Sequence, residues 1–254
     1  MKVFLSAEWH NLINLTYRVP AEKLEPILPK GVELDLFEGH AHLSLVAFDF
    51  INTRVKGVKI PFHVDFPEIN LRYYVRAGKH RGVVFVKELV PKHCIAFVAK
   101  RFYNEPYESH PMESQHTTES DGKLNSLHSL WVNSQEFTIQ TTAAAEIQIP
   151  GPETAAHFFK EHDLGFGIDK KGETLCYEVS HPVWETRDLV DVKLNFDFGK
   201  IYGEEWAFLN DMEPHFPLFA VGSAIKVYHP LSLENWLATR GVEQEALLAK
   251  AVAD

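Results

Sequence analysis

The chain has 254 residues, of which 45% are hydrophobic and 24% charged, values typical of a globular protein long enough to bury a sizeable core. Its net charge of −10 argues against general nucleic-acid binding, and it has no apolar run of the roughly 18 residues that a membrane span needs. Cys94 and Cys176 are too few for a disulfide framework, and His10 interrupts the N-terminus before a signal-peptide apolar segment forms. We therefore expect a cytoplasmic protein with no membrane and no nucleic-acid partner.

Short alternating segments separated by turns dominate the first part of the chain. Apolar and polar side chains alternate over residues 13–19, which predicts a half-buried strand. An apolar stripe with a proline at its start and Pro-x-Gly at its end predicts a short helix over 20–31. Residues 41–55 indicate a long strand, and residues 68–90 predict a hairpin whose turn lies near Ala77–Arg81.

The rest of the chain combines strands with a few short helices. Residues 91–103 have the length and composition of a helix, and residues 165–184 carry the clearest hairpin signal, a Lys-Lys-Gly turn between two strand-like runs. Further strands are predicted at 126–132, 136–147, 188–196 and 218–228, and further helices at 152–163 and 231–254. Many strands with few helices, and no repeat or linker, predict one domain over 1–254 with a β-rich α+β fold, an antiparallel β-barrel.

The charge is unevenly distributed along the chain. Residues 52–102 carry eleven Lys or Arg against three acidic residues, a net charge of +8, whereas the rest of the chain carries −18. Such a region can steer small anions to a cleft, or its long cationic side chains can simply line solvent-facing strand edges. Within it, Arg72, Tyr74 and Arg76 share one face of a predicted strand.

Lys100 and Arg101 stand side by side in the predicted 91–103 helix. At about 100° per residue, the apolar side chains of this helix form one stripe, and both cations flank its polar side. One interpretation is a pair of solvated surface cations. The other is a nucleophile, because a cation roughly 6 Å away at an effective dielectric of about 20 costs about 2–3 kcal/mol and lowers the pKa of a lysine.

Histidines are numerous but give no complete site. His40 and His42 share a strand face and would form half of a metal site, but no spacing signals a third ligand, so we expect no metal. His181, followed by Pro182, lies near Trp184, which suits either a pocket wall or a structural contact. The sequence contains no nucleophile elbow, P-loop, dinucleotide fingerprint or HExxH motif, so hydrolase and dehydrogenase functions have no support and no cofactor is expected.

The most distinctive stretches of the chain are NLRYYVR at 70–76, RFYNEPY at 101–107 and EVSHPVWE at 178–185. Together with further segments between about residues 5 and 230, they resemble a bacterial family of unknown function, the YqjF-like proteins. That family is in turn similar to acetoacetate decarboxylase. The resemblance implies a cone-shaped β-barrel with a central ligand cavity.

The same resemblance implies candidate catalytic residues. Acetoacetate decarboxylase forms a Schiff base on the first of two adjacent lysines, and the second lowers the pKa of the first. By order along the chain, Lys100 matches the first lysine and Arg101 the second, and an arginine supplies the same perturbing charge. The decarboxylase also has an arginine in its first barrel strand, to which His10 is the nearest match, with Arg18 close by.

Three hypotheses about function follow. In the first, the barrel binds a small carboxylate through Arg72, Arg76 and Arg101, and Tyr74, His181, Trp184 and His10 line the pocket. In the second, the protein is a cofactor-independent Schiff-base lyase acting on a β-keto acid through Lys100 and Arg101. In the third, it is a non-catalytic structural or regulatory protein that dimerises, and a homodimer is the general expectation for a protein of this size.

Overall fold

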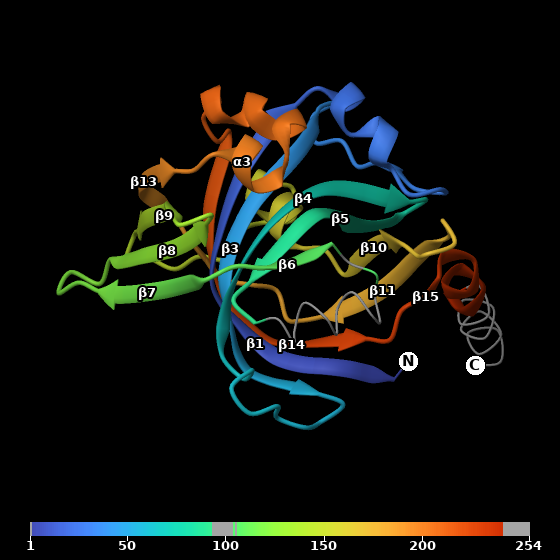
Figure 1. The fold of residues 1–254 in the computed structure, drawn as a ribbon, viewed down its shortest axis with the longest axis horizontal. Helices are drawn as coiled ribbons and strands as arrows, with labels where there is room; N and C mark the ends of the chain where they lie inside the picture. The colour runs from blue at the N-terminus through green and yellow to red at the C-terminus, as the bar shows by residue number, and fades with distance from the viewer. Residues whose placement is uncertain (1, 93–103, 105, 241–254) are drawn as a thin grey trace.

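A ring of seven strands forms the centre of the structure, a computed structural model that describes residues 2–92, 104 and 106–240 (Figure 1). The ring strands are β1 (Val3–Val19), β3 (Ala41–Val55), β4 (Phe66–Ala77), β5 (His80–Val90), β10 (Leu164–Ile168), β11 (Thr174–Ser180) and β14 (Phe216–Tyr228). The predicted strand at 41–55 and the predicted turn between β4 and β5 are therefore confirmed.

The ring strands pair in the order β14-β1-β3-β4-β5-β10-β11, and β11 pairs back to β14. All of these pairings are antiparallel except that between β5 and β10, where Gly82 to Val84 run parallel to their partners. The ring closes through two residue pairs, Val179 with Val227 and Ser180 with Lys226. The predicted β-rich fold is confirmed, and it departs from a wholly antiparallel barrel at the β5–β10 contact.

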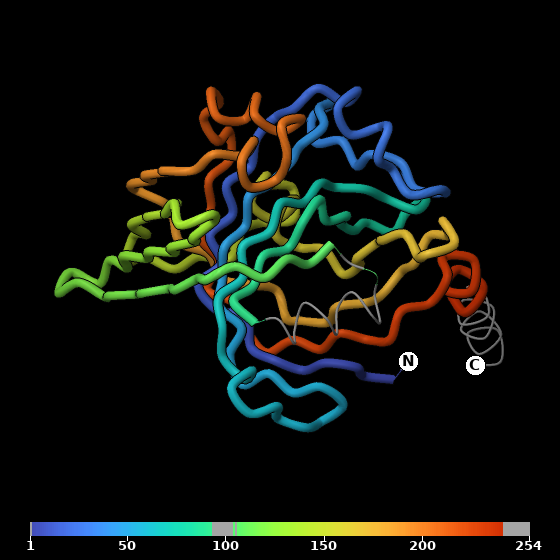
Figure 2. Tube along the Cα trace, in the orientation of Figure 1, coloured from blue at the N-terminus to red at the C-terminus, as the bar shows by residue number. Residues whose placement is uncertain are grey.

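A second, four-stranded sheet stands out from one side of the ring (Figure 1). Its order is β13-β9-β8-β7, and Figure 2 shows the β7–β8 hairpin extending well beyond the ring. The strands are β7 (Met112–Thr118), β8 (Leu124–Val132), β9 (Gln135–Ala143) and β13 (Leu189–Asn195). Short strands at the margins of the ring are β2 (Glu33–Leu34), β6 (Tyr107–Ser109), β12 (Thr186–Arg187) and β15 (Leu231–Ser232).

Helices are short throughout the described residues. They are α2 (Ala155–Lys160), α3 (Phe198–Tyr202), the 3-10 segments η1 (Ala21–Lys23), η2 (Glu25–Ile27) and η3 (Glu204–Asp211), and a helical stretch at 233–240. None of the helices in this part of the chain is both long and apolar enough to cross a membrane.

Two helix predictions need correction and one cannot be compared. The predicted helix at 20–31 consists of two separate 3-10 turns, because Pro26 has no N–H with which to continue an α-helix. The predicted C-terminal helix begins only after the short strand β15, and residues 241–254 lie outside the described part of the chain. The predicted helix at 91–103 also falls almost wholly outside it.

Strand β3 is buried on both of its faces. Leu43, Leu45 and Ala47 belong to an apolar core outside the ring, and Val46 and Phe48 belong to a second core inside it. Because side chains alternate along a strand, one strand thus contributes to two cores. Burial on both faces fits the apolar run at 45–48, and it also leaves His42, Ser44 and Asp49 as buried polar residues of this strand.

The outer core joins the ring to the second sheet. Met112, Leu130 and Phe137 of the second sheet pack in the same cluster as the outward side chains of β3 and β4. A polar contact also links the ring to the second sheet. His116 Nε2 of β7 lies 2.6 Å from Asp49 Oδ2 of β3. His128 of β8 lies beside them, and burial lowers its pKa to about 4, so its imidazole is neutral at pH 7.

Gly222 of β14 lies directly against strand β1, where it pairs with His10. Gly222 has a φ of +88°, and a Cβ added to it would overlap the carbonyl oxygen of Trp9. The backbone of Asn11, next to His10, also has a positive φ of 57°, at a register shift between β1 and β3. This bulge and Gly222 together set the bend of the two strands.

Replacing Gly222 by alanine should therefore destabilise the fold by at least about 3 kcal/mol, since the methyl group adds a φ penalty of about 1–2 kcal/mol and must also displace a backbone carbonyl. Urea unfolding measures this loss. Gly172→Ala is the matched control, because Gly172 has a φ of +82° but a Cβ there would meet nothing within 4 Å. Equal losses for the two variants would contradict the steric argument.

Candidate functional site

A cavity of about 120 Å³ is lined by residues from every strand of the ring. Cavities of about 150 Å³ hold benzene-sized molecules, so this space suits a small organic compound. Most of its wall is apolar and includes Trp9, Phe48, Phe50, Phe66, Phe85 and Trp184. Pockets of this kind owe their specificity to the few polar groups that they contain.

A second hollow, of about 410 Å³, lies beside Tyr73, Tyr202 and Trp206. Tyr73 belongs to the outer core, so this hollow faces away from the interior of the ring. Among the described residues, Glu205 is the only charged side chain in its lining. The cavity inside the ring therefore presents more charged side chains to a ligand than this hollow does.

Strand β4 supplies three polar side chains to the cavity, Glu68, Asn70 and Arg72, because residues two apart share a face. Glu68 is fully buried and accepts hydrogen bonds from Asn70 Nδ2 at 3.0 Å and from the Tyr107 hydroxyl at 3.1 Å. Burial raises the pKa of Glu68 to about 7, although these hydrogen bonds and the nearby Arg72 charge act against the rise. The charge of the cavity therefore changes near neutral pH.

Arg72 brings a cation to the cavity wall. Its Nε is buried and has no hydrogen-bond partner within the described residues. His162, which also lines the cavity, is neutral, because burial and the charges of Arg81 and Arg72 hold its pKa well below the usual range. Arg72 can thus offer a buried N–H and a positive charge to an anionic group.

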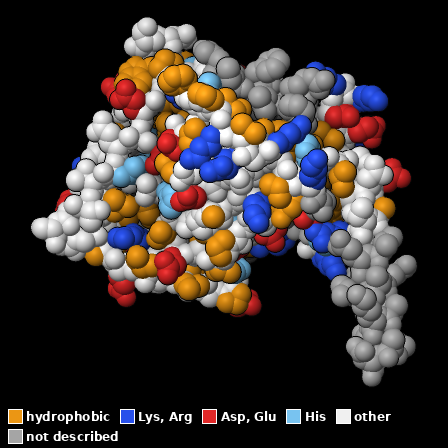
Figure 3. Space-filling model, turned by 90° about the horizontal axis from the view of Figure 1, so that it is seen from below, with side chains coloured by type: hydrophobic (Ala, Val, Ile, Leu, Met, Phe, Trp, Pro, Cys, Tyr) orange, Lys and Arg blue, Asp and Glu red, His pale blue; other side chains and the backbone are white. Residues whose placement is uncertain are grey.

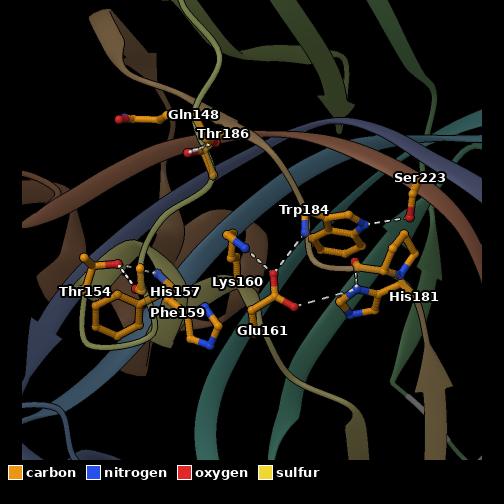
Figure 4. A network of polar contacts seen from close by, with 12 residues as sticks. Gln148, Thr154, His157, Phe159, Lys160, Glu161, His181, Trp184, Thr186 and Ser223 are labelled. Carbon is orange, nitrogen blue, oxygen red and sulfur yellow. Dashed lines mark hydrogen bonds and ion pairs between the residues drawn. The ribbon is translucent and has the colours of Figure 1, made fainter.

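A polar network at the cavity wall centres on Lys160, which is 3% exposed and forms an ion pair with Glu161 (Figure 4). Glu161 Oε1 also accepts a hydrogen bond from the backbone N–H of Trp184 at 3.2 Å. The ring of His181 stacks on that of Trp184 with centroids 4.0 Å apart, and its Nδ1 lies 4.0 Å from Glu161 Oε2. A buried lysine, its carboxylate partner and a histidine therefore converge on one region of the cavity.

Helix α2 positions Lys160 at its last residue. Its N-terminus is capped by Thr154, whose side chain accepts a hydrogen bond from the backbone N–H of His157 at 3.2 Å. Phe159 is fully buried and packs against Tyr74, with ring centroids 5.1 Å apart. Anchoring Phe159 in the inner core carries the adjacent Lys160 into the ring.

Three of the residues predicted from sequence, Arg72, His181 and Trp184, line the cavity together. Tyr74 lies behind that wall, where its ring packs 4.9 Å from that of His162. Its hydroxyl lies 2.5 Å from Ser44 Oγ within a buried polar network. Whether any of these side chains contacts a ligand stays a prediction.

The structure does not bring the other predicted residues to the cavity. Arg76 points to the exterior, where its Nη2 lies 3.0 Å from Glu33 Oε1. His10 pairs instead with Glu8, with 3.0 Å between its Nε2 and Oε2. Lys100 and Arg101 lie outside the described residues.

Three cations of the basic segment at 52–102 form ion pairs within the described residues. Besides Arg76, Arg81 pairs with Asp35 at 2.5 Å and Lys87 with Glu108 at 3.1 Å. Figure 3 shows basic and acidic side chains interspersed over one face of the molecule. The charged side chains that the segment 52–102 contributes to the cavity are Arg72 and the buried carboxyl groups of Glu68 and Glu88.

Sequence reasoning missed Glu68, Lys160 and Glu161. Glu68 could have been found by extending the two-residue period of Arg72 back along its strand. Lys160 and Glu161 gave no such signal, since a lysine next to a glutamate at a helix end usually faces solvent.

Comparison with known proteins identifies the family of this chain. A model of the DUF2071 family, described as uncharacterized conserved proteins, matches residues 6–224. The uncharacterized protein YqjF of Bacillus subtilis (strain 168) is 31% identical over 109 residues, which are 42% of this chain and 45% of YqjF. This match therefore spans less than half the length of that relative.

Solved structures with the same fold belong to acetoacetate-decarboxylase-like proteins. An acetoacetate decarboxylase-like enzyme from Sphingomonas wittichii RW1 matches 92% of this chain and 94% of its own, with a TM-score of 0.63 and 11% identity. Acetoacetate decarboxylase from Legionella pneumophila matches 92% and 90%, with a TM-score of 0.61 and 11% identity. The enduracididine biosynthesis enzyme MppR, complexed with pyruvate, matches 92% and 91%, with a TM-score of 0.63 and 12% identity.

The low identities leave the activity open, whereas the TM-scores show a common fold. They confirm the fold that the sequence resemblance implied, a β-rich α+β structure of the acetoacetate-decarboxylase type. The family match covers most of the chain, and it agrees with the resemblance to YqjF-like proteins seen in the sequence. The chain belongs to the DUF2071 family.

Proposed function

We propose that the cavity inside the ring binds a small organic acid. Its carboxylate would contact Arg72, and its apolar part would lie among the aromatic side chains of the wall. One observation carries the proposal: the buried Nε of Arg72 has no hydrogen-bond partner within the described residues. An unsatisfied buried donor costs about 1–3 kcal/mol, and a carboxylate would satisfy it with a charge-assisted hydrogen bond.

The proposal predicts different effects for two arginines of the same strand. Arg72→Gln should weaken the binding of pyruvate or acetoacetate about 10–100-fold, since a hydrogen bond to a charged group contributes about 1.5–3 kcal/mol. Arg76→Gln is the matched control and should bind normally, because Arg76 pairs with Glu33 away from the cavity. Isothermal titration calorimetry measures both affinities. Equal affinities in the two variants would rule out Arg72 as the anion contact.

Anion affinity should also fall as the pH rises through 7. Because the pKa of Glu68 is raised to about 7, this carboxyl group is mostly neutral at pH 6 and mostly charged at pH 8. Pyruvate stays ionised over this range, so a charged Glu68 would repel it, with an expected loss of about tenfold. Titrations of wild type and Glu68→Gln at both pH values test this, since the variant should lose the dependence. An unchanged dependence in the variant would assign it to another group.

Lys160 favours a second candidate function, a Schiff-base lyase acting on a β-keto acid. It is a lysine of the cavity wall with a carboxylate, Glu161, next to its ammonium group. Once Glu161 has accepted a proton from Lys160, the free amine can add to the substrate carbonyl, and loss of water leaves an iminium ion. Cleavage of the carboxylate C–C bond sends its electron pair to the iminium, releases CO₂ and leaves an enamine. Protonation at carbon and hydrolysis by water then release a ketone and regenerate the amine.

The solved MppR complexes, one with pyruvate and one with the condensation product of pyruvate and imidazole 4-carboxaldehyde, support keto acids as ligands to try first. The sequence resemblance favours Lys100 as the nucleophile instead, and that prediction stands beside this one. Different observations support the two lysines as the nucleophile. Lys160 is supported by geometry, and Lys100 by its order along the chain.

Borohydride trapping distinguishes the two lysines. The protein is incubated with pyruvate or acetoacetate, reduced and mapped by peptide mass spectrometry. We expect an adduct on Lys160 that disappears in Lys160→Ala and persists in Lys87→Ala, a lysine that pairs with Glu108 outside the cavity. An adduct on Lys100 would favour the mechanism implied by the resemblance. No adduct on either lysine, with keto acid binding intact, would leave the cavity as a binding site only.

A further inference from the structure

A second cluster of polar side chains lies outside the cavity, where the four-stranded sheet meets the ring. Asp49 belongs to β3, His116 to β7 and His128 to β8. One potential ligand atom from each of them lies within 4.8 Å of the other two. Figure 1 shows that β3 meets the β7–β8 hairpin, which is far from it in sequence, at the base of the projecting sheet. Tertiary packing therefore assembles two imidazoles and one carboxylate at this joint.

His128 has no structural role that accounts for its polarity. It is 0% exposed, and neither of its ring nitrogens has a hydrogen-bond partner in the described part of the chain. Its ring lies edge-on to that of His116, with centroids 5.5 Å apart. A buried imidazole with both nitrogens unpaired is unusual, because buried polar groups are almost always satisfied.

The other two residues are held in orientations suited to ligation. Asp49 accepts a hydrogen bond from Ser114 Oγ at 2.6 Å and one from Asn11 Nδ2 at 3.3 Å. His116 Nδ1 lies 2.9 Å from Ser126 Oγ. If Nδ1 donates to that hydroxyl, the lone pair of His116 Nε2 is free for a cation, and such outer hydrogen bonds typically orient metal-binding histidines.

We propose that Asp49, His116 and His128 bind a divalent transition-metal ion of the Zn²⁺ class. Two imidazole nitrogens and one carboxylate oxygen suit Zn²⁺, with water as a fourth ligand, whereas Ca²⁺ and Mg²⁺ prefer oxygen ligands throughout. Ligand atoms on a tetrahedral Zn²⁺ with bonds of about 2.0–2.2 Å are about 3.4 Å apart, so side-chain shifts on the order of 1 Å complete the site. Without the ion, His116 Nε2 and Asp49 Oδ2 lie 2.6 Å apart and share a proton. The ion binds between these two atoms, and the proton is released to solvent.

This site is separate from the cavity and serves to join the two sheets. Phe48 and Phe50 line the cavity, so Asp49 between them points to the opposite face of β3. An ion bound there connects β3 to both β7 and β8. Its binding should stabilise the attachment of the projecting sheet to the ring.

The test uses the full chain, stripped of metal by chelator and titrated with Zn²⁺. We expect one Zn²⁺ per chain with a Kd at or below about 1 μM, and a thermal midpoint that rises with Zn²⁺ concentration. Co²⁺ in place of Zn²⁺ should give the visible absorption bands of a tetrahedral site with nitrogen and oxygen ligands. Absence of stoichiometric binding in the folded wild-type protein would overturn the proposal.

Variants then assign the ligands. His128→Gln and His116→Gln should each weaken Zn²⁺ binding at least 100-fold. Because His116 is partly exposed, His116→Gln still tests the site if His128→Gln fails to fold. His42→Gln is the matched control, since His42 is also buried with an unpaired Nε2 in the described region, but it belongs to no such cluster. Equal weakening in the control, or undiminished binding in both ligand variants, would show that the ion binds elsewhere.

Discussion

Strands β3 and β4 present alternate side chains to two separate cores, one inside the ring and one outside it. Because most side chains on both faces of these strands are buried, a polar side chain buried there must find a partner within the protein or in something that the protein binds. Glu68, Asn70 and Arg72 are such residues on the inner face of β4, and Asp49 is one on the outer face of β3. Both the cavity inside the ring and the cluster around Asp49 arise from this constraint.

Charges inside the ring are arranged in compensating groups. Lys160 pairs with Glu161, and Glu68 accepts two hydrogen bonds close to the charge of Arg72. A buried charge without such compensation is costly, and burial accordingly raises the pKa of Glu68 and lowers that of His162. Two such perturbed groups in the wall of one cavity are typical of binding and catalytic sites.

The relationship to acetoacetate-decarboxylase-like proteins extends over nearly the whole fold but only about a tenth of the residues. A ring that encloses a cavity can serve several chemistries, since the inward side chains can change while the outward ones keep the core. Here the apolar wall is interrupted by residues from β4 and from the end of α2. The chemistry of this protein therefore depends on those positions rather than on the fold.

Local patterns in the sequence predicted much of the secondary structure. The alternation in 68–90 and the strand-like pattern of 41–55 anticipated β3, β4 and β5, because strand period and turn chemistry are local properties. The helix predicted at 20–31 was wrong in kind, since Pro26 interrupts the hydrogen bonding that its apolar stripe suggested. The side of the sheet that a side chain faces was predictable only from the two-residue period within one strand. On β4, this period separates the inward Arg72 from the outward Tyr73.

By itself, the sequence determined the strand-rich class, the family resemblance and the placement of Arg72, Tyr74 and Arg76 on one strand face, because each of these can be read from short segments of the chain without knowing how the segments pack. Only the tertiary structure decided that Arg76 and His10 pair with surface carboxylates while Arg72 reaches the cavity. It also decided that Lys160 is buried and that Asp49, His116 and His128 converge. These outcomes depend on which strands and helices pack together across long stretches of sequence, and the identity of such neighbours is not encoded in any local pattern.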